Sequence, residues 1–359
     1  MTPMVSATID AGALRHNLHR VRRWAPRSRV MAVIKANAYG HGLVTVARAL
    51  AEADAFAVAR VDEGLTLRNA GIATRTVLLE GVFDRGQLDS AAAAGFELVV
   101  HTAEQIDLLR QARAGVRFKI WLKLDSGMNR LGFKGAAFAA ALEALRMLPS
   151  VESPVNFFTH FASADSPELP TTNEQLARFA QAIGTEPGER SIANSAGMLG
   201  FPEAQADWVR PGLLLYGVSP FDGSIGADFG LLPAMTLRSH IIALKDLEAG
   251  EQVGYGGAWT APRPTRLAVA AVGYGDGYPR NLSSGSPVLV NGERVPLAGR
   301  VSMDMIGIDV TGLERPPQLG DPVILWGGGL PVEEIAVWAD TIPYELLCGI
   351  SQRVAVTLV

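Results

Sequence analysis

Short apolar runs alternate with longer stretches of helical periodicity through the first 220 or so residues of the chain. The runs are rich in Val, Ile, Leu and Phe, which predicts buried strands. Eight strands that alternate with helices favour a closed (β/α)8 barrel over a doubly wound open sheet, the alternative that we also considered. The eight runs cover residues 30–35, 55–60, 76–81, 96–101, 118–125, 155–160, 191–195 and 212–217.

The pattern changes near residue 225, where the helical period fades and strand signals follow one another closely. Asn291-Gly292, between two apolar runs, is typical of a tight β-hairpin. We therefore expect an α/β chain with a barrel over residues 1–225 and a mostly β domain over residues 226–359. The segment VSATID, within the first ten residues, predicts one more strand ahead of the barrel, and this strand is a candidate member of the β domain.

Composition and charge exclude several classes of function. The 359 residues are 48% apolar and 19% charged, which is typical of a globular protein with a large core. A net charge of −4 provides no basic footprint for nucleic acid or for a membrane surface. Cys348 is the single cysteine, so no internal disulfide is expected. With no signal-peptide pattern and no apolar run of about 18 residues, we expect a cytoplasmic protein.

Polar side chains gather at or just beyond the ends of several runs. The carboxyl ends of barrel strands meet at one rim, where catalytic residues lie. Each residue alone has a structural interpretation, such as a lysine whose stem covers apolar surface or a hydrogen-bonded structural histidine. Their shared position is what predicts a site. The residues are Lys35, Lys123, Asp125, Arg130, His160, Asn194, Ser195 and Arg210.

A lysine held among apolar residues can act as an amine nucleophile toward a carbonyl group. That carbonyl could belong to a substrate, as in an aldolase, or to pyridoxal phosphate. Residues 194–197, NSAG, offer a hydroxyl and backbone N–H groups at a possible helix start, which suits a phosphate. Arg210 adds a cation, and His160 could stack on a planar ring. The combination favours pyridoxal phosphate, and no metal is expected.

At these motifs the chain resembles the alanine racemases, a family of pyridoxal-phosphate enzymes with a barrel and a β domain. The resemblance covers the whole chain and rests on nine motifs in order. They are VIKANAYGHG (33–42), LKLDSGMNRLGF (122–133), THFASAD (159–165), NSAG (194–197), RPGLLLYG (210–217), VGYGGAW (253–259), GYGDGYPR (273–280), GRVSMDM (299–305) and YELLCGISQRV (344–354).

The resemblance implies a set of cofactor-binding residues. Lys35 would bond pyridoxal phosphate covalently, and His160 would lie against its ring. Arg210 would hydrogen-bond the ring nitrogen, and because a guanidinium keeps its proton, the ring nitrogen would stay unprotonated and side reactions would be limited. The phosphate would be held by Tyr39, Ser195, Gly212 and Tyr344, with Asn194, Leu213 and Leu79 beside them.

The resemblance also implies two catalytic bases. Lys35 would take the proton from D-alanine and Tyr255 from L-alanine. A tyrosine has an ordinary pKa near ~10 and needs cationic neighbours, for which Arg130 and His160 are candidates. Tyr255 and Met303 would reach the barrel of another subunit, which makes a homodimer with shared sites. Arg130 and Met303 would contact the substrate.

Further roles follow from the same resemblance. Lys123 would be carbamylated to N6-carboxylysine and orient Arg130; the alternative is an unmodified surface pair with Asp125. The gate at the entrance to the site would be formed by Asp165, Arg280 and Arg300, with Tyr274 and Tyr344 at the inner neck of the same entrance.

The implied function is interconversion of L- and D-alanine, either to supply D-alanine for peptidoglycan or to degrade alanine. The alternative in the same chemistry is a broad-specificity amino-acid racemase, but such relatives usually carry a secretory signal and often a disulfide. A related decarboxylase would present an acidic group, not Arg210, to the ring nitrogen. A non-catalytic pyridoxal-phosphate-binding protein would match the barrel alone.

Overall fold

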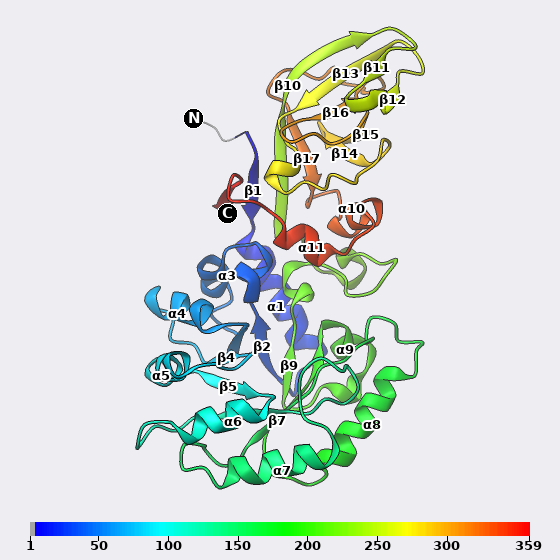
Figure 1. Ribbon diagram of the computed structural model, residues 1–359. Helices are drawn as coiled ribbons and strands as arrows, with labels where there is room; N and C mark the ends of the chain where they lie inside the picture. Colours follow the sequence, from blue (N-terminus) through cyan, green and yellow to red (C-terminus); the bar gives the residue numbers. More distant parts are fainter. Residues whose placement is uncertain (1–3) are drawn as a thin grey trace.

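In the computed structural model, which describes residues 4–359, eight short parallel strands close into a barrel (Figure 1). Each strand pairs with the next in sequence, and the last pairs with the first. The predicted barrel is thus confirmed and the open sheet is excluded. The strands are β2 (Arg29–Val33), β3 (Ala55–Val58), β4 (Thr76–Leu78), β5 (Glu97–Val100), β6 (Ile120–Lys123), β7 (Asn156–Phe158), β8 (Arg190–Asn194) and β9 (Trp208–Arg210).

The eighth predicted strand, residues 212–217, was wrong. Leu213–Tyr216 forms the 3-10 helix η2, and the strand that closes the barrel is β9, directly before it. All four residues of η2 are buried, so the segment is uniformly apolar and its periodicity cannot separate a strand from a buried helical turn. Arg210 therefore lies at the carboxyl end of a barrel strand.

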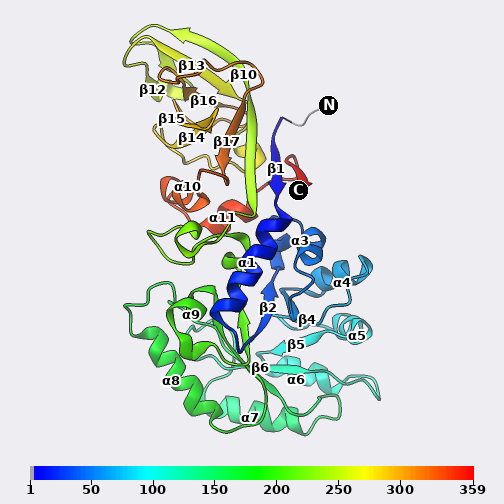
Figure 2. The same cartoon turned by 180° about the vertical axis from the view of Figure 1, so that it is seen from behind.

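Helices surround the barrel, as Figure 2 shows from behind. The helix α1 illustrates why they form: the Asp10 side chain accepts a hydrogen bond from the Ala13 N–H, and an apolar face that includes Leu14, Leu18 and Val21 is buried. The outer helices are α1 (Ala11–Trp24), α3 (Leu43–Ala49), α4 (Val61–Asn69), α5 (Arg85–Ala94), α6 (Ala103–Arg110), α7 (Gly135–Arg146), α8 (Thr171–Ile183) and α9 (Ser195–Gly200).

The second part of the chain is a mostly β domain built around the long strand β10 (Met235–Leu247), which pairs with β1, β13 and β17. The predicted hairpin is confirmed, with positive φ at Asn291 and Gly292. The other strands are β11 (Gln252–Val253), β12 (Trp259–Thr260), β13 (Thr265–Ala270), β14 (Pro287–Val290), β15 (Glu293–Pro296), β16 (Ile306–Asp309) and β17 (Pro322–Trp326).

Both ends of the described chain lie in the sheet of the β domain. The strand β1 (Ser6–Ile9) pairs antiparallel with β10 and parallel with β18 (Ala355–Leu358). The chain therefore starts in the β domain, builds the barrel and returns. Two short helices, α10 (Val332–Trp338) and α11 (Pro343–Cys348), lie where the two parts meet (Figure 1).

Close backbone contacts fix this junction. A Cβ atom at Gly40, on the barrel, would lie 2.1 Å from the carbonyl oxygen of Leu347 on α11. At Gly217, directly after η2, a Cβ would lie 1.9 Å from the carbonyl oxygen of Leu232. Only glycine permits such an approach, so the two parts of the chain are held in one arrangement.

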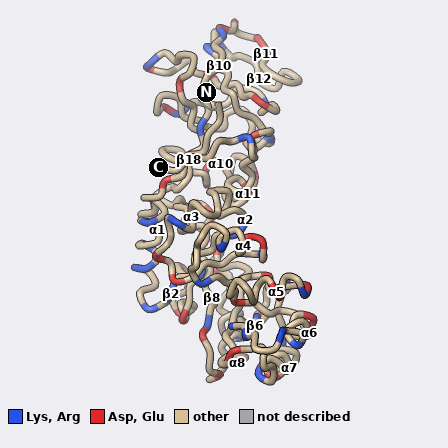
Figure 3. The backbone as a smooth tube through the Cα atoms, turned by 90° about the vertical axis from the view of Figure 1, so that its left-hand side faces the viewer, with Lys and Arg blue, Asp and Glu red and all other residues tan. Residues whose placement is uncertain are grey.

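Charged residues of both signs are interspersed along the barrel and the β domain in the backbone view of Figure 3. Within residues 4–359, no helix combines the length and the apolar character needed to cross a membrane.

Replacing Gly217 by Ala tests the junction. Gly217 and Gly71 both have positive φ, 82° and 77°, but a Cβ at Gly71 meets nothing within 4 Å. We expect Gly71→Ala to lower the free energy of unfolding by about 1 kcal/mol, the cost of a left-handed backbone. Gly217→Ala adds a backbone overlap and should cost roughly 3 kcal/mol or more. Urea denaturation measures both; equal losses would contradict the close contact.

Candidate active site

Lys35 lies on a left-handed turn directly after strand β2. The four residues that follow it, 36–39, have φ between 48° and 54°, and Gly40 completes the turn with φ 78°. A left-handed conformation costs about 1–2 kcal/mol for each residue that carries a Cβ. We call residues 35–40 the Lys35 turn. Its strain shows that the surrounding structure imposes this backbone on the residue that carries the amine.

Several predicted phosphate ligands come together beside this turn. The Gly212 N–H donates to Ser195 Oγ at 2.9 Å, and a Cβ at Gly212 would lie 2.7 Å from the hydroxyl oxygen of Tyr39. Asn194 Oδ1 accepts from the Gly197 N–H at 2.8 Å and so caps α9, while Leu213 is buried at the start of η2. These residues form a small cradle of hydroxyl and N–H groups in which only glycine fits at position 212.

Aromatic rings form the wall behind the cradle. Tyr39 packs edge-on against Tyr216 at 4.8 Å and against Tyr344 at 5.6 Å, measured between ring centroids. Burial raises the pKa of Tyr39, and burial together with Asp165 raises the pKa of Tyr344 to about 12. Both phenols therefore keep their protons at neutral pH and can donate hydrogen bonds. Leu79 follows strand β4 and is half-buried against the core.

Arg210 is 3% exposed and lies at the end of β9. Its Nη2 donates to the Thr159 carbonyl at 2.6 Å and lies 3.3 Å from His160 Nδ1. Its guanidinium also lies 3.9 Å from the ring centroid of Phe158. Burial lowers the pKa of Arg210 to about 9, so it stays charged at neutral pH. Its Nε–H makes no hydrogen bond within the described residues and remains available to a ligand.

His160 is neutral in this environment. Burial, followed by the positive charges of Arg210, Lys123, Arg130 and Lys35, holds the pKa of His160 well below its usual range. The contact with Arg210 Nη2 fits an unprotonated Nδ1. The prediction that His160 is a cationic neighbour of the catalytic tyrosine is therefore wrong. His160 still lies where a planar ring could pack.

Lys123 is 7% exposed, so the alternative of a surface pair with Asp125 is also wrong. Asp125 instead accepts from the backbone N–H groups of Gly127 and Asn129 and pairs with Lys134 at 3.5 Å. Burial, with the charges of Arg210 and Arg130, lowers the pKa of Lys123 to about 8. A substantial fraction of this amine is therefore neutral near physiological pH.

The mouth of the barrel holds positive charge without matching negative charge. Among residues 4–359, Lys35, Lys123, Arg130 and Arg210 take part in no ion pair. Lys123 and Arg210 are buried, and a buried charge without an ionic partner is costly, so this arrangement suits anionic ligands. The same part of the chain contains no group of three His, Cys, Asp or Glu side chains placed to hold a metal ion.

Tyr344 packs against Tyr39 in the same chain, but the other predicted site residues of the β domain do not join those of the barrel within one chain. Tyr255 is 73% exposed and Met303 is 53% exposed. Tyr255 belongs to η4 (Tyr255–Gly257), which lies between β11 and β12, and Figure 1 shows these two strands far from the barrel. Tyr274, Arg280 and Arg300 are also in this domain, and in the described chain Asp165 pairs with neither arginine.

Sequence reasoning missed several residues that shape the site. Tyr216 donates its hydroxyl to the Val33 carbonyl at 3.0 Å, and Phe158 lies under the Arg210 guanidinium. His41 donates from Nδ1 to the Tyr39 carbonyl, and Glu63 accepts from the Ala36 N–H. His41 was visible as part of the YGHG motif. Glu63 gave no comparable signal, because it lies 27 residues beyond the backbone that it contacts.

Comparison with known proteins agrees with this geometry. Residues 9–220 match the model of the alanine racemase N-terminal domain, and residues 234–358 match that of the alanine racemase C-terminal domain. The chain belongs to the alanine racemase family. An alanine racemase of Shewanella sediminis is 50% identical over 358 residues, which covers 100% of both chains. One of Aeromonas hydrophila is 51% identical over 348 residues, or 97% of both.

Solved structures of this family share the whole fold. The biosynthetic alanine racemase of Pseudomonas aeruginosa superposes with a TM-score of 0.96 at 43% identity, covering 100% of both chains. The alanine racemase of Bartonella henselae, whose structure is described with covalently bound pyridoxal phosphate, superposes with a TM-score of 0.89 at 30% identity, covering 99% of both.

The buried His41 predicts a loss of stability in acid. Burial lowers the pKa of His41 from 6.5 to about 4. Between these pH values the unfolded chain binds a proton that the folded chain excludes, so stability is complete above pH ~6.5 and falls as pH approaches 4, by at most about 3 kcal/mol. We expect His41→Gln to flatten this part of the profile. Urea denaturation at fixed protein concentration measures it.

His19 provides the matched control, since it is exposed and no buried group depends on it. His19→Gln should leave the slope between pH 6.5 and 4 unchanged. An equal slope in the His41 variant and in the unmodified chain would show that His41 does not contribute to acid unfolding.

Proposed function

We propose that this chain interconverts L- and D-alanine with pyridoxal phosphate as cofactor. The observation that carries the proposal is the set of unpaired cations at the barrel mouth, beside Lys35 and a cradle of hydroxyl and N–H groups. A phosphate and a substrate carboxylate are the anions that such a site would bind. Membership in the alanine racemase family supports the reaction and the substrate.

The residues present fit this cofactor. Tyr39, Ser195 and the Gly212 N–H would hold the phosphate, with Tyr344 packed against Tyr39. The Nε–H of Arg210 would meet the ring nitrogen, and because the guanidinium stays charged at neutral pH, it offers a hydrogen bond there and not a proton. Neutral His160 would pack against the ring.

Pyridoxal phosphate, bound through Lys35, supplies a sink for the electrons of the substrate Cα–H bond. The chain must then move a proton on each face of Cα. Lys35 Nζ would take or return it on one face, and the Tyr255 hydroxyl of a second copy on the other. Arg130 would hold the substrate carboxylate. With His160 neutral and Lys123 carbamylated as proposed below, Arg130 is also the cation left to lower the pKa of that tyrosine.

The site would be shared within a homodimer. Tyr255 and Met303 are exposed in one chain, and Tyr255 lies between β11 and β12, which Figure 1 shows far from the barrel of the same chain. A head-to-tail pair would place each beside the Lys35 of the other subunit. In the same pair Tyr274, Arg280 and Arg300 would face Asp165 and Tyr344 across the entrance, and these bulky groups favour a substrate with a small side chain.

Lys123 would be carbamylated. Its neutral amine nitrogen would attack the carbon of CO2, form an N–C bond and release one proton, which leaves an anionic carbamate. That anion would pair with Arg130 and offset part of the positive charge at the mouth. The burial of Lys123 and its cationic neighbours support this proposal.

The product would serve as D-alanine for peptidoglycan or enter alanine catabolism, in the cytoplasm. A broad-specificity amino-acid racemase would use the same catalytic and cofactor-binding residues. The exchange measurement described next distinguishes the two substrate ranges.

Absorbance and solvent deuterium exchange at Cα test the cofactor and the substrate together. We expect a visible band of bound pyridoxal phosphate that Lys35→Ala removes, and rapid exchange on L- and D-alanine but not on L-serine or L-lysine. Comparable exchange on serine or lysine would indicate a broad-specificity racemase. Absence of the band after cofactor is added would refute the assignment.

Mixed dimers test the shared site. Lys35→Ala and Tyr255→Phe should each be inactive alone. Co-expressed with different tags, they form heterodimers in which one site carries both changes and the other carries neither. Random pairing should therefore restore about a quarter of the normal racemase activity. No recovery in purified heterodimers would place Lys35 and Tyr255 of one site in the same chain.

A further inference from the structure

A side chain from the next strand–helix unit of the barrel hydrogen-bonds the backbone of the Lys35 turn. Glu63 lies on helix α4, and its Oε1 accepts a hydrogen bond from the Ala36 N–H at 2.6 Å. That N–H belongs to the peptide bond that directly follows Lys35. Charge-assisted hydrogen bonds of this kind are stronger than neutral ones, so the contact fixes the plane of this peptide.

The other oxygen of the same carboxylate is bound to the next strand. Glu63 Oε2 accepts from the Ala59 N–H at 2.7 Å and from the Arg60 N–H at 3.3 Å. These residues follow strand β3, which pairs directly with β2 in the barrel. One carboxylate thus joins the end of β3 to the backbone that leaves β2, at the point where Lys35 is presented.

The remaining side-chain hydrogen bonds to the backbone of the turn, and those of its own side chains, are local. Asn37 Oδ1 accepts from the Leu43 N–H at 2.8 Å, and His41 Nδ1 donates to the Tyr39 carbonyl at 2.8 Å. Among residues 4–359, Glu63 is the one side chain from outside residues 34–43 that hydrogen-bonds the backbone of residues 35–40. A strained turn persists only where its surroundings fix it. Tyr39 and Gly40 at one end of the turn pack against Tyr344 and Leu347, and Glu63 fixes the end that carries Lys35.

We propose that Glu63 is a positioning residue for Lys35: its carboxylate holds the left-handed turn that presents the lysine amine at the barrel mouth. The proposal rests on the proposed function of Lys35 as the residue that bonds pyridoxal phosphate. The competing interpretation is that Glu63 only caps the first turn of α4, since it also accepts from the N-cap residue Arg60.

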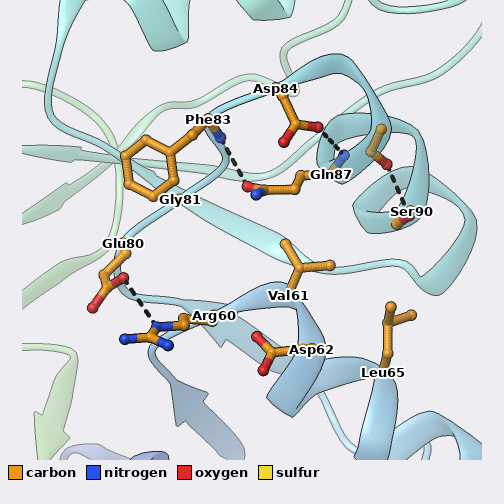
Figure 4. Close-up of a pocket in the computed structure, with 11 residues that line it drawn as sticks. Arg60, Val61, Asp62, Leu65, Glu80, Gly81, Phe83, Asp84, Gln87 and Ser90 are labelled. Carbon is orange, nitrogen blue, oxygen red and sulfur yellow. Dashed lines mark hydrogen bonds and ion pairs between the residues drawn. The ribbon is translucent and has the colours of Figure 1, made fainter.

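Asp62 offers a matched control. It is the adjacent carboxylate in the first turn of α4, is exposed, and lines the surface pocket between α4 and α5 in Figure 4. Its side chain makes no hydrogen bond to residues 35–43. Asp62→Asn removes the same charge from the same helix end as Glu63→Gln, but it leaves the Lys35 turn untouched.

The test is amide hydrogen exchange of the full-length protein, with and without cofactor, in peptides that cover residues 34–42. A glutamine at position 63 keeps one acceptor oxygen but turns an NH2 group toward a backbone N–H. We expect Glu63→Gln to speed exchange in this segment by about tenfold or more, and Asp62→Asn to leave it unchanged. The affinity of the cofactor-free chain for added pyridoxal phosphate should fall by a similar factor in Glu63→Gln alone.

Each outcome has a separate meaning. Equal exchange in the two variants would overturn the proposal and leave Glu63 as a helix cap. Faster exchange with unchanged cofactor affinity would overturn its role toward Lys35. If the unmodified chain binds no pyridoxal phosphate, the proposed function fails, whereas the exchange result still decides whether Glu63 holds the turn. Should Glu63→Gln not fold, Glu63→Asp, whose shorter side chain can retain the cap but cannot span both contacts, provides the same measurement.

Discussion

Positive charge without a partner at the barrel mouth is the constraint on which the site depends. Lys123 and Arg210 are buried, and neither forms an ion pair within the described residues. Removing such charges from water is costly. The hydrogen bonds of Arg210 and its contact with Phe158 offset part of this cost, and an anionic ligand would offset more of it. Burial, reinforced by these charges, holds the pKa of His160 well below its usual range and lowers the pKa of Lys123 to about 8. The protonation of the site therefore depends first on burial and then on this arrangement of cations.

The barrel makes this arrangement possible because its strands end at a common rim. Arg210 ends the last strand of the barrel, Lys123 ends the fifth, and the Lys35 turn comes after the first. The backbone conformation shapes the site as well as the side chains do. A strained left-handed turn presents Lys35, and the absence of a side chain at Gly212 leaves room beside the Tyr39 hydroxyl.

The β domain contributes to the site in two ways. Through α11 it packs on its own barrel, where Tyr344 contacts Tyr39 and Leu347 lies against Gly40. Tyr255 and Met303, by contrast, are exposed, and Tyr255 lies between β11 and β12 in the part of the domain that extends away from the barrel. The close contacts at Gly40 and Gly217 fix how the β domain packs on the barrel. This packing therefore determines the shape of the cradle and the position of the exposed residues that would contact a second copy.

The sequence by itself determined the alternation of strands and helices, the change of pattern near residue 225, the hairpin at Asn291-Gly292 and the family motifs, because these are local patterns of residues. Local pattern could not distinguish the buried turn of η2 from a strand. The neutral state of His160, the burial of Lys123 and the contact of Glu63 with the Ala36 N–H were decided by the tertiary structure. Each depends on charges or hydrogen bonds between segments far apart in the chain, and a side chain's solvation is fixed only when those segments meet.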